Sequence, residues 1–271
     1  MKDLVQLKGN FKKQSGSLNV DAIAKALEDA YLQSRRPAKF TQKKSFAPSG
    51  VGYGNGKCPR YWWYMFNGID TVDDNDAVSI ANMAYGTEAH ARIQGLFEKA
   101  GILVDAERPL ENQDPPIFGF MDAMIDVDGE HVVCEIKTTK QEAFMIREAK
   151  RTPPGYHLIQ ILIYMKLTDS TKGFLLYENK NTGELLVLPV YMDDANTKIV
   201  DEAFEWMKVV YEQAKHEIPQ RPFTRSSPAC KYCPLAEVCW DGYTKAVKTR
   251  GVVGVDPNPG TVLIPPLEVP A

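Results

Sequence analysis

The order of hydrophobic and polar positions predicts a helix first, then strands, then helices mixed with further strands. Apolar residues recur at helical spacing in five stretches, at 17–33, 78–99, 141–152, 156–168 and 194–217. Shorter apolar runs bounded by turn residues predict strands at 118–127, 130–140, 172–178 and 184–190. This order indicates an α+β fold with a small mixed sheet.

The stretch 118–140 carries the most informative alternation. Its central pair, Asp128-Gly129, favours a two-residue hairpin turn, so opposing residue numbers sum to 257 and Asp122 faces Glu135. Cross-strand partners lie roughly 4.5–5.5 Å apart at Cβ. Lys137 follows Glu135 by two positions and therefore lies on the same face of the strand. Two acids and a lysine thus share one face of an otherwise apolar hairpin.

Such a group is costly to bury without a function. The carboxylates of Asp122 and Glu135 supply hard oxygens, which suit Mg²⁺ or Mn²⁺ better than zinc. These ions stabilise charge on a phosphate and lower the pKa of a bound water, while Lys137 can orient the attacking water or offset charge. The pattern therefore indicates a phosphodiester-hydrolysing centre. A surface ion-pair ladder is the alternative, against which the apolar surroundings argue.

Two further polar pairs occur at a spacing of four residues in predicted helices. Gly86 and His90 lie on one face of 78–99, and a histidine there is, by itself, more typical of a partly buried side chain than of a ligand. Gln160 and Tyr164 lie side by side in an otherwise apolar helix. We interpret the second pair as either a buried hydrogen bond or the wall of a site.

Composition and charge limit the function classes. The 271 residues have 44% hydrophobic content and a net charge of −3, so any nucleic-acid contact must come from a local basic patch. No apolar run approaches the ~20 residues that span a bilayer, which predicts no membrane partner. The beginning of the chain lacks the apolar core of a signal peptide, so we expect a cytoplasmic protein. No phosphate-binding loop for ATP is present.

Five cysteines in a reducing compartment favour metal binding or catalysis over disulfides. Cys134 lies within the second hairpin strand, on the face opposite Glu135, and is interpreted as a buried structural thiol. The other four lie in loop-like sequence beside proline or aromatic residues; they are Cys58, Cys230, Cys233 and Cys239. Four thiolates form a common zinc set.

The run FGFMD, thirteen residues before EIK, resembles motifs of the PD-(D/E)xK nucleases, specifically the RecB-like branch. GTEAH upstream and Q-x-x-x-Y downstream are similar to the histidine and Gln/Tyr motifs of that branch, and all occur in the expected order. The resemblance implies a restriction-endonuclease-like core and three groups of site residues: metal ligands, a catalytic lysine, and residues that position DNA or support the site. The implied metal ligands are His90, Asp122, Glu135 and the Ile136 carbonyl. Lys137 would be the catalytic lysine, and Gln160 and Tyr164 would position DNA or support the site.

The cysteine spacing is similar to that of iron–sulfur RecB-like nucleases, which include CRISPR-associated Cas-four exonucleases and AddB-type nuclease domains. One cysteine, Cys58 in the run CPR, is followed about 170 residues later by C-x2-C-x5-C. The resemblance implies a [4Fe–4S] cluster that clasps Cys58 to the C-terminal segment and closes a long loop. Zinc remains the alternative, although its sites usually pair two C-x2-C units.

Three regions are expected. Residues 1–48 form an arm and a helix, 49–240 the nuclease domain, and 241–271 a proline-rich tail that is expected to be disordered or docked on a partner. Within the domain, the glycine-rich run 49–56 is interpreted as a flexible connector. The aromatic residues after Cys58 are expected to pack in the core, with base stacking as the alternative.

The resulting hypothesis is a metal-dependent DNA exonuclease acting on single strands or DNA ends. Spacer acquisition in CRISPR systems, with CRISPR proteins as partners, and recombination or end-processing are the expected settings, and an oligomer is compatible with either. The alternative is a non-catalytic DNA-end-binding or adaptor subunit. Such a subunit is expected to lose Asp122, Glu135 or Lys137, and the sequence retains all three.

Overall fold

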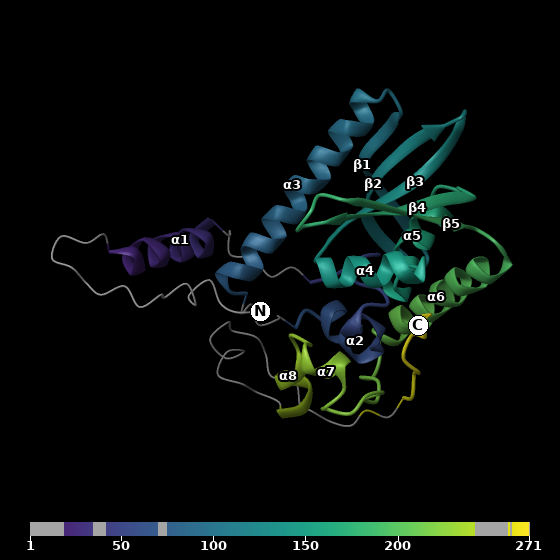
Figure 1. Ribbon diagram of the computed structural model, residues 1–271. Coiled ribbons are helices and arrows are strands. Elements are labelled where there is room, and N and C mark those ends of the chain that lie inside the picture. Colours follow the sequence, from purple (N-terminus) through teal and green to yellow (C-terminus); the bar gives the residue numbers. More distant parts are fainter. Residues whose placement is uncertain (1–18, 35–41, 70–74, 242–259, 261, 271) are drawn as a thin grey trace. The chain divides into compact units, whose positions relative to one another are not determined.

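The computed structural model describes residues 19–34, 42–69, 75–241, 260 and 262–270 (Figure 1). The chain divides into two compact units. The first comprises Met1–Lys39 and Asp73–Ala89, and the second comprises Phe40–Val72 and His90–Ala271. Helix α3 (Ala77–Lys99) begins in the first unit and continues into the second.

The first unit contains α1 (Val20–Ser34) and the beginning of α3. Helix α1 buries no residue along its length. The side chain of Asn19 accepts a hydrogen bond of 3.1 Å from the backbone N–H of Ala22, which satisfies a donor at the helix N-terminus. The predicted helix is therefore confirmed from Val20 onward, whereas the predicted start at residue 17 lies outside the described residues.

The second unit is built on a five-stranded sheet with the order β1-β2-β3-β4-β5. Strands β3 and β4 are parallel, and the other neighbouring strands are antiparallel. The strands are β1 (Leu103–Gln113), β2 (Pro116–Val127), β3 (Glu130–Thr139), β4 (Lys172–Asn179) and β5 (Leu185–Tyr191). The prediction of an α+β fold with a mixed sheet is confirmed, although the pattern did not predict β1.

Two helices make the crossover that parallel strands require. They are α4 (Gln141–Lys150) and α5 (Gly155–Leu167), between β3 and β4. The remaining helices are η2 (Gly54–Lys57), α2 (Pro59–Phe66), α6 (Asp194–Gln213), α7 (Pro228–Lys231) and α8 (Ala236–Asp241). In Figure 1, α5 lies between the sheet and α6.

The turn between β2 and β3 has the predicted register. Ala123 pairs with Cys134, and the two turn residues Asp128 and Gly129 have φ angles of 55° and 83°, as a type I′ turn requires. The pairing of the two strands begins at Ala123, however, so Asp122 and Glu135 are not ladder partners. Strand β2 pairs with β1 along most of its length. On the side away from β1, the beginning of β2 bridges to Phe46 rather than to β3. Strands β2 and β3 therefore form a fork at Asp122.

Apolar side chains fill both faces of the sheet. On one face, the fully buried residues of α5 pack with the sheet, α2 and α6. On the other, Ile93 of α3 packs against Ala123, Cys134 and Ile136. Along α3, Ile93 is buried against the sheet whereas Leu96 is 47% exposed. The predicted burial of Cys134 is confirmed.

The glycine-rich run before α2 is part of the core. Val51 is fully buried, and the carbonyl of Gly56 accepts a 2.8 Å hydrogen bond from the indole N–H of Trp62. Trp62 itself is buried against Phe46 and Phe66. The expectation of a flexible connector is therefore wrong, and core packing of the aromatic residues in α2 is confirmed. The run packs closely because glycine lets two backbone segments approach each other.

The C-terminal segment also packs on the second unit. Ile264 and Leu267 are buried, Trp206 donates its indole N–H to the carbonyl of Pro265 at 2.9 Å, and Leu267 donates its N–H to Lys57 at 3.0 Å. The expected disorder is wrong for 262–270, while 242–259 lies outside the described residues. None of the helices that the structure describes is long and apolar enough to cross a bilayer.

We predict opposite stability effects for two glycine-to-alanine substitutions. A Cβ at Gly56 would lie 1.7 Å from the carbonyl oxygen of Gly50, whereas a Cβ at Gly95 in α3 would meet no described atom within 4 Å. Gly56→Ala should therefore lower the free energy of unfolding by ~1–3 kcal/mol or more. Gly95→Ala should raise the free energy of unfolding by up to ~1 kcal/mol. Urea denaturation measures both. A Gly56→Ala protein as stable as the parent would contradict the packing of this loop.

Candidate active site

Asp122 occupies the fork between β2 and β3. One of its oxygens, Oδ2, accepts a 2.7 Å hydrogen bond from the backbone N–H of Ile136, replacing the strand partner that β3 lacks at this point. Its other oxygen, Oδ1, lies 3.4 Å from Nδ1 of His90. The interaction with Asp122 raises the pKa of His90. Asp122 and His90, two of the metal ligands that the family resemblance implies, are thus direct neighbours.

An ion pair holds the histidine-bearing part of α3 against the sheet. Two residues after His90, the guanidinium of Arg92 contacts both carboxylate oxygens of Glu178 at 2.5 and 2.6 Å. Glu178 lies near the end of β4 and its side chain is buried. A charge-assisted contact of this kind restricts the helix more than a neutral hydrogen bond does. It fixes the end of α3 from which His90 reaches Asp122.

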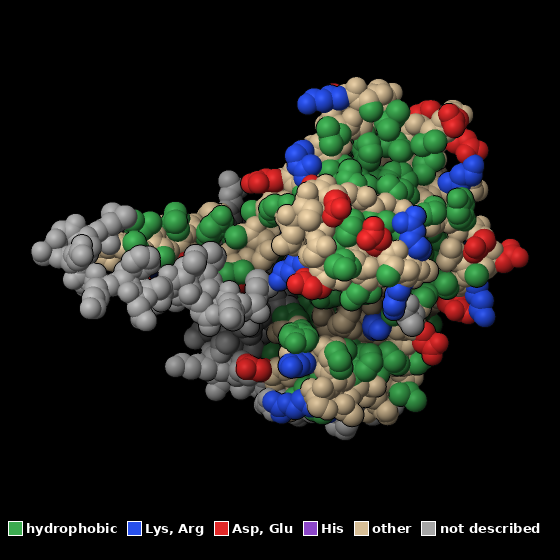
Figure 2. Space-filling view, in the orientation of Figure 1, with side chains coloured by type: hydrophobic (Ala, Val, Ile, Leu, Met, Phe, Trp, Pro, Cys, Tyr) green, Lys and Arg blue, Asp and Glu red, His purple; other side chains and the backbone are tan. Residues whose placement is uncertain are grey.

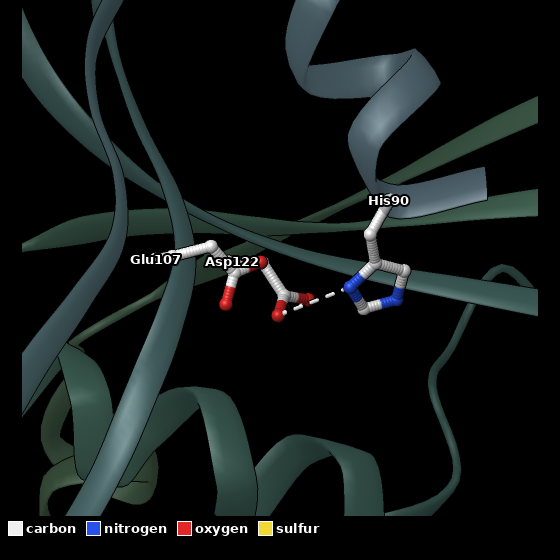
Figure 3. A group of neighbouring side chains, drawn as sticks. All are labelled: His90, Glu107 and Asp122. Carbon is white, nitrogen blue, oxygen red and sulfur yellow. Dashed lines mark ion pairs between the residues drawn. The ribbon is translucent and has the colours of Figure 1, made fainter. Parts of the chain in front are cut away.

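Glu107 completes an acidic group that sequence reasoning missed. Ligand atoms of His90, Glu107 and Asp122 all lie within 4.8 Å of one another, and the three side chains converge from α3, β1 and β2 (Figure 3). The side-chain amide of Gln94 holds the group together with 2.8 Å hydrogen bonds to Glu107 Oε1 and to the carbonyl of Asp122. Glu107 has a φ of 50°, a conformation that costs free energy for a non-glycine residue and is found preferentially at functional sites.

The register of the first hairpin explains the position of Glu107. Ala106 pairs with Ala123 and Arg108 with Met121, so Glu107 lies opposite Asp122. The hairpin closes through Asp114 and Pro115, because Gln113 pairs with Pro116. Had these two residues been interpreted as a turn, the arithmetic that related Asp122 to Glu135 would also have identified Glu107.

Glu135 is buried in the strand that follows the fork. Its Oε1 accepts hydrogen bonds from Lys137 at 2.5 Å and from the amide of Gln160 at 2.6 Å. Its Oε2 is buried without a hydrogen-bond partner among the described residues. Burial, with the nearby charge of Asp122, raises the pKa of Glu135 to about 8. Lys137 and Gln160 thus both contact the same oxygen of Glu135.

Tyr164 lies one turn after Gln160 on α5 and is 2% exposed. Its hydroxyl reaches β2 where that strand has no side chain, since a Cβ on Gly119 would be 2.9 Å from the hydroxyl oxygen. Burial and the charges of Glu135 and Asp122 raise the pKa of Tyr164. The hydroxyl therefore stays protonated at neutral pH and can donate a hydrogen bond.

A second group missed from the sequence lies beside Lys137. Tyr177 is the neighbour of Lys137 on β4; its ring lies 4.8 Å from the guanidinium of Arg147, and its hydroxyl is 2.8 Å from Nδ1 of His157. Arg147 also donates to Thr139 at 2.9 Å. Burial, together with the charges of Lys137 and Arg147, lowers the pKa of His157 to about 3. His157 is therefore neutral, and this side of the site carries net positive charge.

The Nε of Arg147 is buried without a partner within the part of the chain that the structure describes. Nothing in the sequence distinguished Arg147 from other surface cations, because its role depends on where α4 folds back.

The four loop cysteines line one cavity. Its wall includes Cys58 at the start of α2 and three residues from the segment that carries α7 and α8, namely Cys230, Cys233 and Cys239. Burial raises the pKa of the Cys58 and Cys233 thiols to about 12. Two positions about 170 residues apart in sequence are thus brought together by folding.

The chain is similar to a known family in sequence and to known proteins in structure. Residues 24–240 match the sequence model of the PD-(D/E)XK nuclease superfamily. No curated protein sequence matches the chain. Among solved structures, SSO0001 shares 18% identity over 82% of this chain and 98% of its own, with a TM-score of 0.44. LHK-Exo in complex with dAMP shares 15% over 63% and 88%, with a TM-score of 0.47. The alkaline exonuclease LHK-Exo from Laribacter hongkongensis shares 12% over 69% and 94%, with a TM-score of 0.48.

Proposed function

Because the chain belongs to the PD-(D/E)XK nuclease superfamily, we propose that it is a metal-dependent DNA exonuclease acting on single strands or DNA ends. The observation that carries this proposal is the buried carboxylate of Glu135, which contacts Lys137 on one side and leaves Oε2 without a partner among the described residues. A cation would satisfy that oxygen. The adjoining acids, Asp122 and Glu107, offer more oxygens than a structural salt bridge needs.

The donor set fits a hard divalent cation. By the family resemblance, His90, Asp122, Glu135 and the Ile136 carbonyl would hold Mg²⁺ or Mn²⁺. The ligand atoms that lie within 4.8 Å of one another are those of His90, Asp122 and Glu107, so Glu107 would contribute a further oxygen. When bound, such an ion would offset negative charge on the phosphate in the transition state. Burial and repulsion from Asp122 raise the pKa of Glu135, and the same positive charge would relieve that repulsion.

The side chains have separable roles in the hydrolysis. A water oxygen forms a bond to phosphorus while the bond from phosphorus to a sugar oxygen breaks, and the proton lost by the water is balanced by one gained by the leaving oxygen. Lys137 would orient the water and offset charge on the phosphate, while Gln160 fixes Glu135 through their hydrogen bond. Tyr164, as a buried donor on the same helix, would support the site. Arg147 adds positive charge beside Lys137 for a substrate phosphate.

The surface is compatible with a substrate that is engaged locally. Figure 2 shows basic and acidic side chains interspersed over the face in view, in keeping with a net charge of −3. Binding would depend on the cationic side of the site and on contacts next to it. Spacer acquisition in CRISPR systems and recombination both generate the DNA ends that such an enzyme would process, in the cytoplasm and with partner proteins.

We predict that the purified chain, supplied with Mg²⁺ or Mn²⁺, degrades end-labelled single-stranded DNA. Glu135→Gln and Lys137→Ala should each lower the rate at least about 100-fold, since each removes a group that acts on the reacting phosphate. Glu130→Gln is the matched control, because Glu130 is an exposed acid on the same strand. DNA binding without cleavage by the parent chain would favour the adaptor alternative, and full activity of Glu135→Gln would refute the site assignment.

We also propose that Cys58, Cys230, Cys233 and Cys239 hold a [4Fe–4S] cluster. The four thiols line a single cavity, which supports a common ligand. Four thiolates are also a common zinc set, which is the alternative. A cluster at this position would tie α2 to α7 and α8.

This assignment predicts that anaerobically purified protein is brown and contains iron and acid-labile sulfide. Cys230→Ser should lower the melting temperature more than Cys134→Ser does, since only Cys230 would connect separate segments. Cys134 is a suitable comparison because its thiol is buried in the sheet core. A colourless protein with stoichiometric zinc, or the reverse ranking of the two variants, would contradict the cluster.

A further inference from the structure

The outer face of the first hairpin presents two phenylalanines next to the candidate active site. Phe118 and Phe120 are 44% and 50% exposed, and they alternate along β2 with the buried residues Ile117 and Met121. Gly119, between them, faces Tyr164 and the core. The hairpin thus buries one face in the core and leaves its aromatic face in solvent, where apolar area costs free energy unless a ligand covers it.

The strand register extends this face to the active site. Phe118 pairs with Glu111 and Phe120 with Pro109 across the β1–β2 ladder. The strand then continues to Asp122, which has a carboxylate oxygen within 4.8 Å of one from Glu107. Phe120 is two residues from Asp122, a separation of roughly 6.7 Å along a strand. A group resting on Phe120 would therefore adjoin a phosphate held at Asp122.

We call the surface formed by Phe118, Phe120, Pro109 and Glu111 the aromatic strip. The charges of its side chains indicate which part of a nucleic acid it accepts. Its side chains are two phenylalanines, a proline and a glutamate, with no lysine or arginine at the described positions of this face. Phosphates would be repelled by Glu111, whereas the cation proposed for the active site would offset the charge of Glu107. Nucleobases are uncharged, and their faces stack on aromatic rings. The strip is therefore suited to bases, while the positive side of the site beside Lys137 is suited to the backbone.

The two rings form a corner. Their centroids are 5.3 Å apart and their planes meet at 81°, so a flat base stacked on one ring would present its edge to the other. Base pairs inside a duplex already stack on their neighbours and cannot enter such a corner. Only an unpaired base, from a single strand or a frayed end, has a free face.

We propose that Phe118 and Phe120 bind an unpaired nucleobase of the strand whose phosphate lies at the active site. This inference rests on the proposed nuclease function and adds a substrate class to it: strands with an unpaired base at the reacting position. Pro109, opposite Phe120, extends the apolar surface toward β1.

The test measures DNA binding by fluorescence anisotropy in a Lys137→Ala background, so that no cleavage interferes. The probes are single-stranded oligonucleotides in which one abasic site is moved stepwise along the chain, and a blunt duplex of the same sequence. With both phenylalanines present, one abasic position near the bound end should weaken binding roughly tenfold, as loss of one stacked base does. Phe118→Ala with Phe120→Ala should weaken binding of the intact single strand by a similar factor and abolish the effect of that abasic position.

Three controls separate stacking from other effects. Tyr191→Ala removes an equally exposed aromatic residue from β5 and should change nothing. Tyrosine at both phenylalanine positions should retain the abasic effect, whereas leucine, which is apolar but lacks a ring, should lose it. Duplex affinity should change less than twofold in every variant.

Unchanged single-strand affinity in the double alanine variant would overturn the inference, as would equal losses for single strand and duplex. Because the assay measures binding alone, a chain that retains Lys137 yet cleaves no DNA would refute the proposed nuclease function without deciding the base-binding result. The two proposals can therefore fail separately.

Discussion

The burial of the Glu135 carboxylate is the constraint on which the rest of the second unit depends. An ionisable group 1% exposed is tolerated only if partners compensate for the lost hydration. Lys137 supplies charge from the same strand, and Gln160 supplies a donor from α5, a helix otherwise lined with apolar side chains. The crossover from β3 to β4 places that helix against the sheet. The topology thus serves the site, and one oxygen still lacks a partner among the described residues.

How much of this site could be predicted depended on turns that the sequence specifies locally. Asp128 and Gly129 require one turn type, so the register, and with it the face shared by Glu135 and Lys137, could be deduced before the structure. The separation of β2 from β3 at Asp122 could not be deduced from the sequence, because it depends on Phe46, from a distant part of the chain, pairing with β2. Glu107 was missed for a simpler reason: β1 was not predicted, so its register with β2 was not considered.

Errors elsewhere arose where a pattern was interpreted without its tertiary surroundings. The glycine-rich run before α2 has the composition of a flexible connector, yet glycines 50 and 56 permit a close backbone contact that packs it. Residues 262–270 lack periodicity but dock through single contacts, including Trp206 with Pro265. Arg147 and His157 joined the site only because two helices fold back on Tyr177. Periodicity reports regular elements; it does not report irregular segments that pack one residue at a time.

Calorimetric titration of the metal-free protein with Mn²⁺ would determine whether Asp122, Glu135 and their neighbours form a cation site. Since the pKa of Glu135 is raised to about 8, the carboxyl is largely protonated at pH 6 and must release its proton when a cation binds. We predict proton release on binding, higher affinity at pH 8 than at pH 6, and loss of binding in Glu135→Gln. Binding that is independent of pH and unaffected by Glu135→Gln would contradict this prediction.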